Sequence, residues 1–399
     1  MAGFISDNSN LTVPTAFEDG YEKAKKLNPG LAETYIEHIT VGDPIADSLM
    51  EELADLTQQQ EHRFIMAGMQ GNEEVLAQAP KSLRDFFEEM KQPPAWLEPE
   101  KFEAGRRSFH EHSDLFIPAF FLVTVQNAAS LIAKSFHATG RVVSDFGLRR
   151  IRQNTRHFVE IMLPGALVDQ GDGWRLSVRI RLVHARLRKL IRESEDWNAA
   201  SWGEPISAAH QGLASANFSA TMLENARKLG ARMNKKTRNS FMQIWRYASY
   251  LVGTPEALLF EGDEAKTREF LKIAGICEPP PSKESAMIAN ALVRALPEIA
   301  GKIHPADQEK MLKHVFRVSR AVLGNELADK LALPKCNTAG FLQTLRLLRQ
   351  MYGLSHKAAP DFANKWRGQN FVFLLEASML DDIKYQLPDH VRVEQSIEY

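Results

Sequence analysis

Apolar residues recur along most of the chain at intervals of three and four positions, which is the period of an amphipathic helix. In the segment 174–191, Ile180, Val183, Leu187 and Ile191 follow this spacing and form one apolar stripe. No run of alternating apolar and polar residues extends beyond a few positions, and the sequence shows no internal repeat. The pattern predicts an all-α fold.

Proline and glycine divide these helical patterns into groups. Residues 1–40 are punctuated by prolines and predict an extended N-terminal arm with one short helix, followed by a single large helical domain at 41–399. Three consecutive prolines within 277–284 cannot continue a helix, so this segment predicts a linker, either between two domains or between two helices of one domain. The longer helices are expected at 102–112, 117–136, 147–163, 174–192, 204–218, 220–229, 237–251, 255–273, 285–296, 305–331, 338–352 and 361–380.

One apolar stretch has the length of a membrane span. Residues 115–133 carry no charge, and 19 residues are just enough to cross a bilayer. Pro118, Gln126 and Asn127 dilute the stretch, so a helix buried in a large core explains it better, and we expect no stable membrane insertion. The first ten residues lack the basic and apolar regions of a signal peptide, which predicts a cytoplasmic location.

Composition excludes several classes of function. Lys and Arg number 49 and Asp and Glu number 50, so the net charge of −1 gives no general attraction to nucleic acid. Cys277 and Cys336 are the two cysteines, too few for a disulfide framework, a four-cysteine metal site or covalent attachment of haem. The sequence also lacks the glycine-rich motifs of nucleotide-binding proteins and the nucleophile motif of serine hydrolases.

The predicted helix 174–192 carries a histidine beside its apolar stripe. His184 lies four positions after Ile180, and Arg181 and Arg188 flank it by one turn on either side. A single imidazole suffices as the axial ligand of haem iron, and arginines one turn away could meet the two anionic propionates. The same pattern also fits a core histidine bonded to a backbone carbonyl, with the arginines in ordinary salt bridges.

The predicted helix 147–163 has a hydroxyl within its apolar face. Thr155 lies four positions after Ile151 and three before Phe158, and Arg152 precedes it by about one turn. A hydroxyl there could face a pocket and steer bound oxygen. Alternatively, it could bond back to the carbonyl four residues earlier in the helix.

Taken in order, several segments resemble the latex-clearing rubber oxygenases, which belong to a wider family with fungal oxygenases of mycophenolic acid synthesis. The most specific part is the motif His-Ala-x-x-Arg at 184–188, on the predicted helix 174–192, which is rich in arginine. The likeness covers about 42–218 and runs through Gly42-Asp-Pro-Ile-Ala-Asp47, Pro94-Ala-Trp96, Thr139-Gly-Arg141, Arg150-Ile with Thr155, Gly173 to Arg188, and Trp202-Gly-Glu-Pro-Ile206.

The resemblance implies a helical fold with a globin-like core that binds b-type haem. The histidine that matches His184 is then the axial iron ligand, and the residues that match Arg188 and Thr155 line the haem pocket. We therefore expect a haem-dependent oxygenase that reacts dioxygen with an unsaturated, largely apolar small molecule. The expected catalytic residues are Thr155, Arg152 and Arg188, and the expected cofactor-binding residues are His184, Arg181, Arg150 and Arg141.

The chain departs from the family pattern at several points. Some members carry a lysine just before the threonine, able to occupy the second axial position, whereas this chain has Asn154. Rubber oxygenases place a carboxylate near the haem on an earlier helix, but 115–144 contains no Asp or Glu. These enzymes are also exported. We therefore expect the haem and the fold of the family in this chain, but not its polymer substrate. The alternatives are a non-catalytic haem-binding or sensor protein and a haem-free helical interaction protein. The sequence leaves the oligomeric state open.

Overall fold

The computed structural model describes residues 11–138, 145–168, 170–358 and 387, without the side chains of 145–150 and 351–358. These residues form helices and no strand, so the predicted all-α fold is confirmed. The α-helices are α1 (Glu18–Lys25), α2 (Pro29–Glu37), α3 (Pro44–Leu53), α4 (Gln58–Gln70), α5 (Glu73–Leu76), α6 (Lys81–Lys91), α7 (Glu103–Glu111), α8 (Ser113–Asn127), α9 (Ile132–Ala138), α10 (Asp145–Ile161), α11 (Asp172–Arg192), α12 (Ala199–Trp202), α13 (Ala208–Ala216), α14 (Met222–Leu229), α15 (Lys235–Leu251), α16 (Glu264–Cys277), α17 (Lys283–Ile299), α18 (Pro305–Leu323), α19 (Asn325–Lys330) and α20 (Phe341–Ala358).

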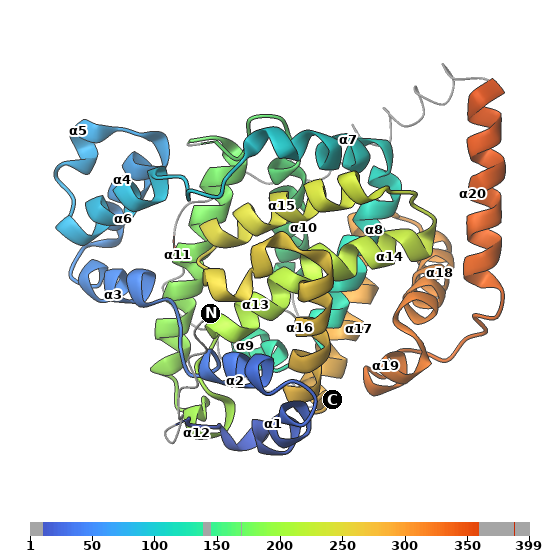
Figure 1. Cartoon of the computed structure of the whole chain (residues 1–399), viewed down its shortest axis with the longest axis horizontal. Coiled ribbons are helices and arrows are strands. Elements are labelled where there is room, and N and C mark those ends of the chain that lie inside the picture. Colours follow the sequence, from blue (N-terminus) through green and yellow to red (C-terminus); the bar gives the residue numbers. More distant parts are fainter. Residues whose placement is uncertain (1–10, 139–144, 169, 359–386, 388–399) are drawn as a thin grey trace, which may run out of the picture.

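Apolar side chains gather in three buried clusters. The largest joins α3, α4 and α6–α8 to α10, α11, α14 and α15, and Phe116, Phe158 and Trp174 are fully buried in it. The second joins α1 and α2 to α13 and α16, and the third joins α8–α10 to α17–α19. In Figure 1 the helices α10, α11, α13 and α15 occupy the middle of the molecule, with α4–α6 at one end and α20 at the other.

The N-terminal segment is not the extended arm that its prolines suggested. Helices α1 and α2 pack against α16, and Phe17 and Tyr35 are fully buried there. Pro29 begins α2 rather than interrupting it, because the first amide of a helix has no partner within the helix and a proline there costs nothing. The side chain of Asn28 caps this helix by accepting from the amide of Leu31.

The single helix expected at 117–136 is instead two helices. The chain bends by 86° between α8 and α9. At the bend, the Ser130 hydroxyl donates to the carbonyl of Asn127 at 2.8 Å, and the amide of Leu131 donates to the carboxylate of Glu278 at 2.7 Å. The second contact caps the start of α9 from a residue 147 positions away, which the local pattern could not reveal.

The proline-rich segment connects two packed helices. It joins α16 to α17, and α17 packs against α8, α9 and α10. Glu278 in this segment is buried and accepts from the Tyr35 hydroxyl at 2.6 Å. Burial, and then the nearby carboxylate, raise the pKa of Tyr35 well above its usual value. The segment therefore contributes a buried polar contact to the core.

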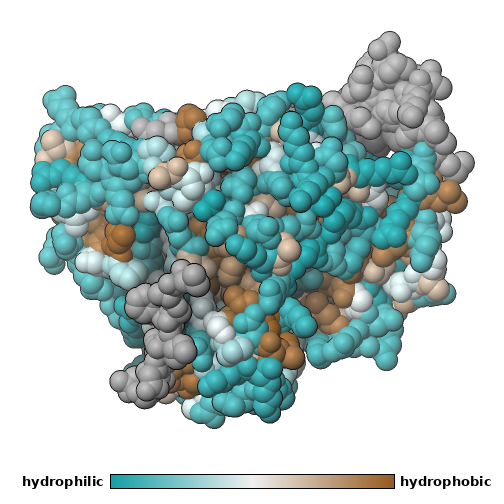
Figure 2. Space-filling view, viewed as in Figure 1, coloured by the Kyte–Doolittle hydropathy of each residue, from teal (hydrophilic) through white to brown (hydrophobic). Residues whose placement is uncertain are grey.

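Taken one at a time, none of the described helices is both long and apolar enough to cross a membrane; α8 and α9 meet these criteria only when they are counted together. The face of the molecule in Figure 2 is mostly hydrophilic, with apolar residues gathered in small areas. The cytoplasmic location expected from the sequence stays a prediction.

The two cysteines should react at very different rates with thiol reagents. Cys277 is fully buried on α16, and burial raises the pKa of its thiol to about 12, whereas Cys336 is exposed. Because the thiolate is the reactive form, we expect a disulfide reagent at pH 8 to label Cys336 alone in the native protein and both residues after denaturation. Peptide mapping distinguishes them, and rapid native labelling of Cys277 would contradict the packing of α16.

Candidate functional site

A large cavity lies between α8, α9, α10, α11, α13 and α15. Its empty space, counted together with its solvent-open mouth, is ≈ 1180 Å³. Aromatic side chains form much of its wall, among them Phe120, Phe136, Phe218 and Trp245. Phe218 lies in the π-helical turn Asn217–Thr221, an irregularity that is frequent at functional sites. The cavity is suited to a large apolar ligand.

His184 lines this cavity from α11. Ile180 and Leu187, one turn before and after it, line the same wall. The opposite face of α11 is buried in the main cluster through residues such as Val178 and Leu182. The helix therefore holds its histidine at the cavity because its other side is fixed in the core.

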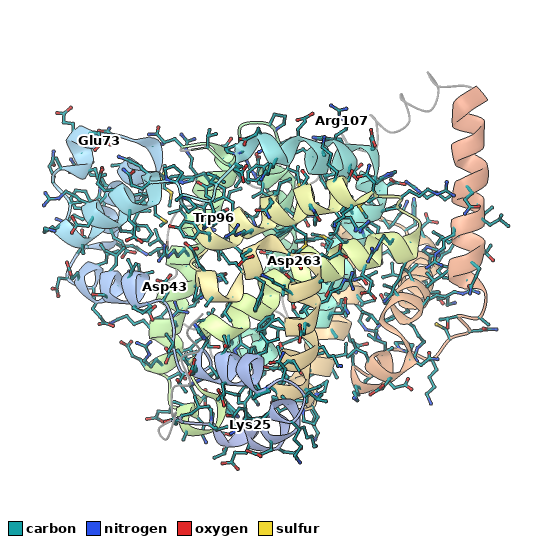
Figure 3. All side chains as sticks on the ribbon, in the orientation of Figure 1. Lys25, Asp43, Glu73, Trp96, Arg107 and Asp263 are labelled. Carbon is teal, nitrogen blue, oxygen red and sulfur yellow. The ribbon has the colours of Figure 1, made fainter. Side chains whose placement is uncertain are left out.

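The arginines that flank His184 are engaged elsewhere. Arg181 donates from Nε and Nη2 to the two carboxylate oxygens of Asp43, at 2.6 and 2.9 Å. Arg188 donates from Nε to Asp47 at 2.8 Å and from Nη1 to the carbonyl of Ile206 at 2.6 Å. Neither belongs to the described residues that line the cavity. The contacts correspond to the ordinary salt bridges that the spacing also allowed, and they fasten α11 to α3, beside Asp43 in Figure 3.

Two glycines make room for these ion pairs. A Cβ on Gly42 would lie 2.5 Å from Nε of Arg188, and a Cβ on Gly253 would lie 2.3 Å from a carboxylate oxygen of Asp43. Gly253 also has a φ of +92°, which other residues adopt with strain. The segment that begins at Gly42 therefore packs closely against α11, and the two glycines leave room for this contact.

Helix α10 turns a different face to the cavity than the sequence indicated. Asn154 and His157, three positions apart on one face, line the cavity, whereas Thr155 and Arg152 are not among the described residues that do so. The apolar stripe instead faces the core, where Phe158 stacks on Phe120 with ring centroids 4.8 Å apart. A cavity need not lie on the apolar face, so the spacing alone did not point to Asn154 and His157.

Arg141 lies outside the described residues, and so does the side chain of Arg150. The structure thus brings His184 to the cavity and does not bring Arg181, Arg188, Thr155 or Arg152 to it. The catalytic and cofactor-binding roles expected of these arginines and of Thr155 stay predictions without support from the cavity.

His157 is a buried imidazole with a defined hydrogen-bond partner. Its Nε2 lies 2.8 Å from the Ser177 hydroxyl oxygen, and that hydroxyl donates to the carbonyl of Gly173 at 2.7 Å. The hydroxyl hydrogen is thereby committed, so we assign the ring hydrogen to Nε2, which leaves Nδ1 as an acceptor. Burial lowers the pKa of His157 to about 4, so the ring is neutral at physiological pH.

The neutral His157 ring makes stability depend on pH. The folded protein binds its proton near pH 4, whereas the unfolded chain binds it near pH 6.5. The neutral ring makes its full contribution to the free energy of unfolding above pH 6.5. This contribution, about 3 kcal/mol, is lost as the pH falls toward 4. Urea titrations across this range should show the loss, and His157→Gln should remove that part of the slope; an unchanged slope would contradict the buried neutral ring.

Residues 106–354 match the family described as "ER-bound oxygenase mpaB/B'/Rubber oxygenase, catalytic domain". The chain belongs to this family. The resemblance read from its motifs is therefore confirmed. The protein named "Rubber oxygenase" from Streptomyces sp. (strain K30) is 22% identical over 261 residues, which cover 64% of this chain and 61% of that relative.

A solved rubber oxygenase relative shares the fold. The structure titled "Structure of Latex Clearing Protein LCP in the closed state" superposes with a TM-score of 0.61 at 19% identity, covering 88% of this chain and 92% of the other. The agreement extends beyond the region matched in sequence. It supports the observed arrangement of helices.

A third cavity histidine escaped the sequence analysis. In this family member His210 is buried on α13, with Nδ1 3.0 Å from the Ser207 hydroxyl and Nε2 3.1 Å from Glu278. Both ring nitrogens are therefore engaged by protein groups. Glu278 lies 68 positions away, so only tertiary structure could reveal the pair.

The residues present fit a haem. His184 supplies an imidazole to a cavity with aromatic walls, and haem iron needs only one or two protein ligands. Two further residues of the wall carry buried polar atoms without a partner in the described part of the chain, Oε1 of Gln211 and Nε1 of Trp245. Leaving such atoms unmet is costly, so both are available to a polar atom of a ligand bound in the cavity. Among the described residues, no group of three or more His, Cys, Asp and Glu side chains could hold a metal ion directly.

The described wall of the cavity carries no carboxylate. The position where some rubber oxygenases have a lysine is Asn154, which lines the cavity with an amide. Both departures from the family pattern that the sequence shows thus concern the wall of the cavity.

Proposed function

We propose that this protein is a haem-dependent oxygenase that uses dioxygen to oxidise or cleave a carbon–carbon double bond of an apolar small molecule. The observation that carries the proposal is the position of His184 on the wall of a large aromatic cavity, in a member of the rubber oxygenase family. His184 would hold the iron of a b-type haem. When bound, the haem supplies the reactivity toward dioxygen, while the protein supplies binding and orientation.

The side chains of the cavity wall would position the substrate and exclude water. Phe120, Phe218 and Trp245 present apolar ring faces to a ligand. Asn154 offers an amide, a much weaker iron ligand than an amine, so it would leave room for dioxygen and substrate in the cavity. The names of the relatives refer to rubber and latex, but for this chain we propose a small molecule that fits within the enclosed part of the cavity.

A non-catalytic haem-binding or sensor protein is the second candidate. The observation that favours it is the lack of a carboxylate on the described wall, where rubber oxygenases place one near the haem. A protein that holds the cofactor and binds small molecules without turnover would not require that group.

Oxygen uptake with a panel of alkenes separates the two candidates. We expect purified, haem-loaded protein to consume dioxygen only when a suitable alkene is present, and isotopically labelled dioxygen to appear in the carbonyl products. Free haem and heat-treated protein at equal iron concentration serve as controls. Bound haem without alkene-dependent uptake would favour the sensor, and a protein that takes up no haem would refute both candidates.

A further inference from the structure

Two neighbouring rings on the cavity wall carry complementary hydrogen-bonding groups. The rings of Trp245 and His157 meet edge to face, with centroids 6.4 Å apart and planes at 80°. Both residues line the cavity. They come from α15 and α10, whose packing against α11 fixes the two rings relative to the wall that carries His184.

Trp245 has a donor that no described residue satisfies. Its Nε1 is buried and lacks a hydrogen-bond partner within the described ranges. An indole N–H can only donate, and leaving a buried donor unmet costs about 1–3 kcal/mol. The site therefore calls for an acceptor atom from a ligand.

His157 has an acceptor on the neighbouring ring. Its Nε2 hydrogen is committed to Ser177, so the lone pair of Nδ1 remains on a neutral ring. A third group, Oε1 of Gln211, is also a buried acceptor without a described partner, while Nε2 of the same amide donates to Ile206 at 3.4 Å. The wall thus presents one unmet donor and two acceptor atoms, one of them on the ring that neighbours the donor.

Stacked aromatic rings adjoin Trp245, and the wall elsewhere carries both apolar and polar residues. Phe218 stacks on Trp245 with centroids 5.4 Å apart and on Phe120 with centroids 5.0 Å apart. A pure hydrocarbon would cover these rings and leave the polar atoms unmet. A carboxylate would satisfy Trp245 but give His157 no hydrogen, and it would bury a charge. A hydroxyl both accepts and donates, so it meets both rings with a neutral group.

We propose that the substrate is an unsaturated alcohol whose hydroxyl binds between Trp245 and His157. The Nε1 hydrogen of Trp245 is donated to the alcohol oxygen, and Nδ1 of His157 accepts the alcohol hydrogen. The apolar chain then lies along the stacked rings. The inference rests on the proposed function for the identity of this cavity as the active site, and it names the class of substrate.

Equilibrium dialysis of matched terpenoid probes tests the hydroxyl site. The probes are geraniol, the hydrocarbon with hydrogen in place of its hydroxyl, and geranyl methyl ether, which keeps the acceptor oxygen and loses the donated hydrogen. We expect the wild-type protein to bind geraniol about five- to tenfold more tightly than the hydrocarbon, as one or two buried hydrogen bonds imply, with the ether between them. Trp245→Phe keeps an aromatic ring but removes the donor, so it should abolish the preference for the ether over the hydrocarbon.

The control variant is Trp202→Phe, which removes an indole N–H that does not line the cavity and should keep the full order of affinities. Three results would overturn the proposal: equal binding of geraniol and the hydrocarbon, no binding of either, or a preference that Trp245→Phe retains. An ordered water that permanently fills the site would give equal binding. Haem content is measured on the same samples. Alcohol preference without haem would refute the proposed oxygenase and leave the hydroxyl site, whereas haem without preference would refute the hydroxyl site alone.

Discussion

Replacing His184 with alanine is expected to weaken haem binding by more than about 100-fold. Changes to residues that merely support a metal ligand cost about 10–100-fold in affinity, and this substitution removes the ligand itself. His184 lines the cavity from a helix anchored on its other face, so we expect the fold to survive the change. The measurement is the Soret absorbance retained after haem addition and gel filtration, with circular dichroism to verify helix content.

The matched control is His210→Gln. His210 lines the same cavity, but both of its ring nitrogens are held by Ser207 and Glu278. We expect this variant to retain most of its haem. A His184→Ala protein with a normal Soret band, or equal loss in both variants, would show that His184 is not the specific ligand.

Replacing Arg181 with methionine is expected to lower the free energy of unfolding by about 3–5 kcal/mol. The substitution strands the carboxylate of Asp43, which is only 4% exposed, without its cation. Asp43 also caps α3 by accepting from the amide of Ala46 at 3.2 Å, so the loss should reach that helix. Urea unfolding followed by circular dichroism measures the change.

A second substitution separates the stranded charge from the lost packing. Asp43→Asn in the Arg181→Met background removes the charge and keeps a side chain that caps helices well. We expect the double variant to recover more than half of the lost stability. If Asp43→Asn instead lowers the stability of the Arg181→Met protein further, the contact between α3 and α11 is not the charge pair that the structure shows.

The features that the sequence predicted are those set by local periodicity. The apolar stripe of α11 placed the helix at 174–192, within two residues of its observed bounds, and indicated that His184 lies beside the buried face. The all-α fold followed from the same period. These properties depend on residues three and four positions apart, which a single sequence displays directly.

The features that it missed depend on partners far apart in the chain. Arg181 meets Asp43 across 138 positions, so its spacing from His184 alone could not distinguish a salt bridge from a propionate contact. The break between α8 and α9 depends on Glu278 in the same way. On α10 the rule that placed Thr155 at a pocket assumed that the pocket adjoins the apolar stripe, whereas the structure opens it beside Asn154 and His157.

The absorption spectrum of the purified wild-type protein tests the central claim most directly. We expect a red protein with a Soret band near the positions typical of histidine-ligated b-type haem, a shift of that band on reduction, and one haem per chain by pyridine haemochromogen assay. Protein that stays colourless after haem is added, with its helices intact by circular dichroism, would contradict the account.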